Sequence, residues 1–196
     1  MPGIRVFIDA DCLHKLYLRT LLLTLSGSGD IHFLWTREVF EEARKSLVAR
    51  FPEDTEKLRL KFDQIKAHFY GNEVKGYQWL IGKLGCRDLN DEHVLAGAIQ
   101  GKADVLLTFN LRDFPKDSLQ GLQVMHPDSF LILWLEANPK EGIQAISKWL
   151  ARFENPPIGA NLACLLVEKI DCPRLAAFIK KHRVKIDRQI RALRPS

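Results

Sequence analysis

The sequence lacks an apolar run long enough to cross a membrane, and it lacks paired cysteines. Its longest apolar stretch, Leu16 to Leu25, is interrupted by Arg19, whereas a membrane-spanning helix needs about 20 apolar residues. Asp9 and Asp11 lie where a signal peptide would carry its apolar segment. The four cysteines form no Cys-x-x-Cys pair, which disfavours both a disulfide framework and a structural zinc site. These absences predict a cytoplasmic protein with reduced thiols and no membrane contact.

The sequence also has no internal repeat and no low-complexity tract. It has the composition of an ordinary globular chain, with 196 residues of which 46% are hydrophobic and 27% charged. That length suits one domain with an appendage. The net charge of +5 is uneven, because Arg174 to Ser196 holds eight Lys or Arg and one Asp. This basic tail is either a nucleic-acid contact, since it neutralises phosphates, or a solvated terminal helix.

Predicted strands and helices alternate through the first two thirds of the chain. Apolar runs predict strands at 5–8, 31–34, 105–108 and 123–126. Helical patterns lie between them, and Thr36 is the expected N-cap of a helix that continues to about Arg50. From Pro139 onward the pattern is helical throughout. We therefore expect a three-layer α/β/α sandwich with a mainly parallel sheet over residues 1–137, and a helical C-terminal extension with a basic tail over 138–196.

Polar side chains follow two of these strands at the point where each strand ends. Asp9 and Asp11 follow the first strand, while Thr108, Asn110 and Asp113 follow the third. Ligands of open parallel sheets bind beyond the carboxyl ends of the strands. We expect these five side chains to lie on the functional edge of the sheet.

Three more acids are candidates for the same place. Asp91 falls in the first turn of a predicted helix and Asp88 lies three residues earlier; capping alone would explain one of them. In the helix after Thr36, Glu42 lies about 115° from the centre of the apolar stripe, nearer than Glu41 at about 145° and Glu38 at about 155°. Glu42 either borders the site or belongs to a solvated acidic face.

A cluster of Asp9, Glu42, Asp91 and Asp113 would be strongly repulsive, because like charges in a partly desolvated cleft raise carboxyl pKa values. A divalent cation relieves that repulsion, and an all-oxygen set of ligands suits Mg²⁺ or Mn²⁺. Such a cation polarises a phosphoryl oxygen and lowers the pKa of a bound water. The pattern therefore favours metal-dependent phosphodiester cleavage.

Five segments together resemble the PIN domain nucleases, and most closely the VapC-like ribonuclease toxins. Each segment is weak alone but specific in combination, and together they cover about Ile4 to Leu135. The segments are Val6–Leu13, Thr36–Glu42, Asp88–Leu95, Thr108–Pro115 and Pro127–Phe130. One departure is Asp11, where the family often has Asn, so that the site holds one more negative charge.

The resemblance implies a Mg²⁺- or Mn²⁺-dependent endoribonuclease that is commonly neutralised by a cognate antitoxin. It also implies roles for individual residues. The catalytic and metal-binding residues are Asp9, Glu42, Asp91 and Asp113, with Asp88 and Asp11 as accessory acids and Thr108 and Asn110 as orienting groups. Arg87 and Arg112 flank the acids and either bind substrate phosphates or form surface ion pairs. The helices after Pro139 lie outside the resemblance and offer a homodimer surface, an antitoxin dock or an RNA contact.

Two other functions compete with this one. In a haloacid dehalogenase-like phosphatase Asp9 would be the nucleophile and Asp11 the acid, but Cys12–Leu13 and the early position of Asp88 fit that pattern poorly. A catalytically inert PIN-like scaffold would bind RNA or a partner without cutting. Its mark would be a missing acid, and no acid of the pattern is missing.

Overall fold

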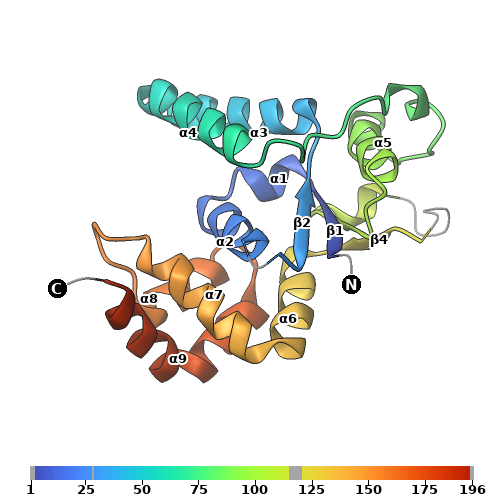
Figure 1. The fold of residues 1–196 in the computed structure, drawn as a ribbon. Helices are drawn as coiled ribbons and strands as arrows, with labels where there is room; N and C mark the ends of the chain where they lie inside the picture. The colour runs from blue at the N-terminus through green and yellow to red at the C-terminus, as the bar shows by residue number, and fades with distance from the viewer. Residues whose placement is uncertain (1–2, 28, 115–120, 195–196) are drawn as a thin grey trace. The chain divides into compact units, whose positions relative to one another are not determined.

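The computed structural model describes residues 3–27, 29–114 and 121–194 (Figure 1). Pro115, the last residue of one segment of the resemblance, and Pro195 and Ser196 of the basic tail lie outside these ranges. Contacts divide the chain into two units. The first unit is Met1–His14 with Gly29–His126, and the second is Lys15–Ser28 with Pro127–Ser196.

The first unit is built on a four-stranded, all-parallel sheet in the order β2-β1-β3-β4 (Figure 1). The strands are β1 (Ile4–Ile8), β2 (Ile31–Leu34), β3 (Val105–Leu107) and β4 (Gln123–Met125). In the central pair Ile8 of β1 lies opposite Leu107 of β3, and both residues are fully buried. A short apolar strand with no exposed face is typical of a parallel sheet. The predicted α/β class is confirmed.

Helices and 3₁₀ turns connect the strands of this unit. The helices are α1 (Ala10–Leu13), α3 (Arg37–Arg50), α4 (Thr55–His68) and α5 (Glu92–Gln100). The 3₁₀ turns are Pro52–Asp54, Gln78–Leu80, Leu89–Asp91 and Leu111–Asp113. Thr36 caps α3 as predicted, since its hydroxyl accepts a hydrogen bond from the Val39 N–H at 3.3 Å. α3 packs on α4 through an edge-on contact between the Phe40 and Phe62 rings, whose centroids are 4.8 Å apart.

The second unit is helical. It contains α2 (Leu16–Ser26), α6 (Pro127–Ala137), α7 (Pro139–Ala151), α8 (Ala160–Glu168) and α9 (Pro173–Leu193). The helical character after Pro139 is therefore confirmed. The Trp149 indole N–H donates to the Thr20 hydroxyl at 2.9 Å, and the buried Asp128 carboxylate accepts from the backbone N–H groups of Arg174 and Leu175.

These units are a different division from the predicted domains. Residues 15–28 and 127–137, which we expect to be part of the nuclease domain, group by contacts with the C-terminal helices. The predicted boundary after residue 137 separates a nuclease domain from an extension by function, which contacts do not test, so it stays a prediction. None of the four cysteines, all of which lie in the described ranges, forms a disulfide. Within the ranges described above, none of the helices combines the length and the hydropathy that a membrane crossing requires.

Candidate acidic site

Asp9 lies at the carboxyl end of β1, held between the sheet and the helix that follows. Its backbone N–H donates to the Leu107 carbonyl at 3.0 Å, which continues the pairing of β1 with β3. Its side chain caps α1 by accepting from the Ala10 N–H at 2.6 Å. Only 7% of Asp9 is exposed. The strand and the cap together place a carboxyl group in the interior of the protein.

Thr108 joins Asp9 to Asp11 at the end of the neighbouring strand. Its hydroxyl is fully buried and lies 2.8 Å from Asp9 Oδ2 and 3.3 Å from Asp11 Oδ2. A hydroxyl carries one proton, and the shorter distance assigns that proton to Asp9. The Phe109 N–H donates to Asp11 Oδ2 at 2.8 Å, and the Asn110 N–H donates to Thr108 Oγ1 at 3.0 Å. The turn after β3 thus orients both carboxyl groups.

The surroundings of Asp9 disfavour its charge. Burial raises its pKa to about 7, and the nearby charges of Asp11 and Asp91 act in the same direction. The hydrogen bonds from Thr108 and Ala10 oppose the shift without cancelling it. Asp11 adds to the imbalance, because its Oδ1 atom is buried and has no hydrogen-bond partner. The end of β1 therefore holds negative charge that the surrounding protein leaves uncompensated.

A second group of acids surrounds Asp91. Burial raises the pKa of Asp91, and the charges of Asp113 and Asp88 raise it further. The Arg87 N–H donates to the Asp113 carbonyl at 3.1 Å, so the loop before α5 adjoins the turn after β3. Asp88 accepts from the Asn90 N–H at 2.9 Å and caps the 3₁₀ turn that contains Asp91. Since Asp91 also contributes to the raised pKa of Asp9, the two groups share one negative region.

Glu42 stands at the edge of this region and contacts a histidine. The His93 Nε2 atom on α5 lies 3.3 Å from Glu42 Oε1 on α3, and His93 Nδ1 lies 2.7 Å from the Asn90 carbonyl. Burial lowers the pKa of His93, but Glu42, the Asn90 carbonyl and the charge of Glu38 all raise it, and the net shift is upward. About half of the Glu42 side chain is exposed. The sequence analysis did not predict this contact between Glu42 and His93. The sequence signal that pointed to it was the position of His93 close to Asp91.

The other residues predicted for the site are exposed and make fewer contacts with it. The Asn110 side chain is exposed, and this residue serves Thr108 through its backbone N–H. Arg87 and Arg112 are exposed. Across residues 3–27, 29–114 and 121–194, no three His, Cys, Asp or Glu side chains converge as a ready-made metal site. The ligand roles of Asp9, Glu42, Asp91 and Asp113 therefore stay a prediction.

Glu92, the neighbour of Asp91, has a separate task. It is buried and accepts hydrogen bonds from the N–H groups of Gly82 and Leu84. The backbone hydrogen bonds, that from Leu84 foremost, lower its pKa. Glu92 therefore holds the loop before α5 in place and is not a member of the acidic site.

Comparison with known proteins gives one partial relative. The chain is 34% identical over 84 residues to a Mycobacterium tuberculosis protein named "Putative ribonuclease VapC50". The match covers 42% of this chain and 49% of that protein, so the chain spans about half the length of the curated relative it matches. No family model matches the chain, and no solved structure matches it. The partial likeness points to the VapC-like ribonucleases, in agreement with the resemblance of the motifs.

Proposed function

We propose that this chain is an endoribonuclease that cleaves RNA phosphodiesters with a Mg²⁺ or Mn²⁺ ion held by Asp9, Glu42, Asp91 and Asp113. The observation that carries the proposal is the joined pair Asp9–Thr108–Asp11 at the end of the two central strands, with the pKa of Asp9 raised to about 7. The name of the partial relative supports RNA as the substrate.

The residues fit a hard divalent cation in charge and in donor chemistry. All the candidate ligands are carboxylate oxygens, the donors that Mg²⁺ and Mn²⁺ prefer. The partnerless Oδ1 of Asp11 and the raised pKa values of Asp9 and Asp91 mark charge that a cation would offset. A bound cation supplies Lewis-acid polarisation of a phosphoryl oxygen and lowers the pKa of a water.

The chain's own residues orient the acids for this task. Two hydrogen bonds, from Ala10 and Thr108, fix the Asp9 carboxyl group. The Phe109 N–H fixes Asp11, and His93 Nε2 lies 3.3 Å from Glu42 Oε1 on the neighbouring helix. Arg87 and Arg112, which flank the acids, are the proposed contacts of the substrate phosphates.

The biological role follows from the resemblance. We propose that the nuclease acts in the cytoplasm as the toxin of a type II toxin–antitoxin pair and that a cognate antitoxin binds it. Residues 1–137 are the proposed nuclease domain, and the helices after residue 137 are the proposed surface for a homodimer, for the antitoxin or for an RNA contact.

Cleavage of a panel of labelled RNAs in Mn²⁺, Mg²⁺ or EDTA tests the proposal. We expect cleavage by the wild-type chain in either metal and none in EDTA. Asp9→Asn and Asp91→Asn each remove one carboxylate charge, and we expect a loss of at least about 100-fold, as for other groups that stabilise a transition state. Asp63→Asn, on the exposed face of α4, is the matched control and should cleave like the wild type.

The opposite outcome favours the inert scaffold. The lack of three converging ligand side chains within the described ranges is the observation that supports that alternative. A folded wild-type chain that cleaves no RNA in either metal and binds no Mn²⁺ would establish it over the nuclease.

A further inference from the structure

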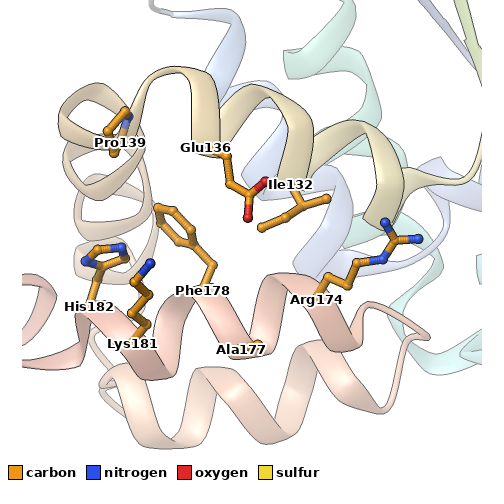
Figure 2. Close-up of a pocket in the computed structure, with 8 residues that line it drawn as sticks. All are labelled: Ile132, Glu136, Pro139, Arg174, Ala177, Phe178, Lys181 and His182. Carbon is orange, nitrogen blue, oxygen red and sulfur yellow. The ribbon is translucent and has the colours of Figure 1, made fainter.

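The second unit contains a pocket between α6, the start of α7 and α9 (Figure 2). Its volume of about 560 Å³ falls in the range of sites that bind small molecules. Ile132, Pro139 and Phe178 supply its apolar wall. The Phe178 and His182 rings form a tilted pair with centroids 4.6 Å apart. Ile132 and Phe178 are themselves buried, at 8% and 6% exposed, so the pocket has an apolar floor beside α9 of which little surface is exposed.

Charged groups are placed around this apolar wall. The Glu136 carboxylate reaches in from α6, while Arg174 and Lys181 lie toward opposite ends of the pocket, with Phe178 between them (Figure 2). The Arg174 Nη2 atom donates to the Ser129 hydroxyl at 3.1 Å, and its Nε atom lies 3.6 Å from Asp128 Oδ2. These contacts hold the guanidinium at one end of the pocket. The pocket therefore offers one acceptor inside and two cations at its ends.

The two cations belong to a longer basic stripe. At 100° per residue, Arg174, Lys181, Lys185 and Arg188 fall within an arc of about 60° on α9 and extend over about 21 Å of the helix. All four residues are exposed. In the described part of the chain, no salt bridge involves the last three. Burial lowers the pKa of His182, and Lys181 and Lys185 lower it further, as expected beside uncompensated positive charge.

We propose that the pocket and the basic stripe of α9 bind single-stranded RNA, with one base in the pocket and the phosphates along Arg174, Lys181, Lys185 and Arg188. Aromatic and apolar walls take unstacked bases, and cations take the backbone. Glu136 favours RNA over an acidic protein segment as the occupant of the pocket. Its carboxylate repels acidic side chains but accepts hydrogen bonds from the exocyclic amino group of a base. The inference rests on the proposed function only in taking RNA as the natural ligand.

Fluorescence anisotropy with a labelled single-stranded RNA, measured on the full chain in EDTA, tests the stripe. The variant combines Lys181→Glu, Lys185→Glu and Arg188→Glu. We expect at least a tenfold weaker affinity, and a slope of log K against log salt that is less negative by about 2, since each lost phosphate contact contributes about 0.7. The control combines Lys45→Glu, Lys61→Glu and Lys75→Glu, which change the net charge equally at exposed positions of the first unit. It should keep the wild-type slope, and equal effects in the two triple variants would overturn the proposal.

Homopolymer RNAs test the pocket. Uracil has no exocyclic amino group, so we expect the wild-type chain to bind oligo(C) and oligo(A) at least about fivefold more tightly than oligo(U), and Glu136→Ala to remove the difference. Poly-glutamate that competes as well as RNA would overturn the proposal in favour of an acidic protein partner.

The failure of this inference can be distinguished from the failure of the proposed function. If the chain cleaves no RNA but the triple variant of α9 loses RNA binding, the proposed function fails and this inference stands. RNA cleavage with unchanged binding in that variant contradicts the inference alone.

Discussion

At the scale of single residues, Asp9 experiences opposing effects on its charge. Two hydrogen bonds favour its charged form, while burial and the charge of Asp11 disfavour it, and the balance raises its pKa to about 7. A carboxyl group that titrates near neutral pH is typical of functional sites. The titration also links the site to the stability of the whole fold.

The stability of the metal-free protein should report this titration. The native state holds a proton on Asp9 up to about pH 7, whereas the unfolded chain releases it near 3.8, so stability is present at low pH and is lost as the pH rises through 7. We expect the free energy of unfolding in EDTA to fall between pH 5 and pH 8 by up to about 3 kcal/mol more in the wild type than in Asp9→Asn. Urea titrations check this, and parallel curves for the two proteins would refute it.

Some of the residues that lie next to one another in the acidic site could be predicted from the sequence, and others could not. Asp9, Asp11 and Thr108 were predictable as a group, because parallel strands end at the same edge of a sheet. The contact between Glu42 and His93 was not predictable, because periodicity gives the face of each helix but not the neighbouring helix that this face meets. A convergence of the four predicted ligands, which stays a prediction, likewise depends on side-chain directions that sequence spacing does not contain.

At the scale of elements, all four strands lie where the short apolar runs predicted them, within about one residue at each end. The short 3₁₀ turns were not predicted as such. Leu89–Asp91 combines a side-chain cap, from the Asn90 N–H to Asp88, with a backbone hydrogen bond from the Asp91 N–H to the Asp88 carbonyl. Such a short turn has no hydrophobic periodicity that would predict it. Pro52–Asp54 is another such turn, directly before α4.

A glycine sets how closely α5 packs against the rest of the first unit. A Cβ atom at Gly97 would lie 2.7 Å from both Phe7 Cζ on β1 and Thr36 Cγ2 before α3. We expect Gly97→Ala to lower the free energy of unfolding by about 1–3 kcal/mol, the usual cost of overpacking. Chemical denaturation measures this, with Gly159→Ala as the control because its Cβ would make an ordinary 3.4 Å contact. Equal stability of Gly97→Ala and the wild type would show that α5 shifts freely.

At the scale of the whole molecule, the α/β class was predictable and the division into two units was not. α2 belongs by contacts with the C-terminal helices. Thr20 meets Trp149 and Tyr17 meets Phe153 across more than a hundred residues of sequence. Local patterns identify α2 as a helix but contain no signal for such distant partners.

The central claim is that Asp9 and Asp91 belong to a site for a divalent cation. Calorimetric titration of Mn²⁺ into the metal-free chain at pH 6, in two buffers of different ionisation enthalpy, tests it most directly. We predict saturable binding with release of close to one proton, because the pKa of Asp9 is about 7 and metal ligands bind deprotonated. Asp9→Asn and Asp91→Asn should bind at least about tenfold more weakly, and Asp63→Asn should bind like the wild type. Equal binding by all four proteins, or none by the wild type, would contradict the claim.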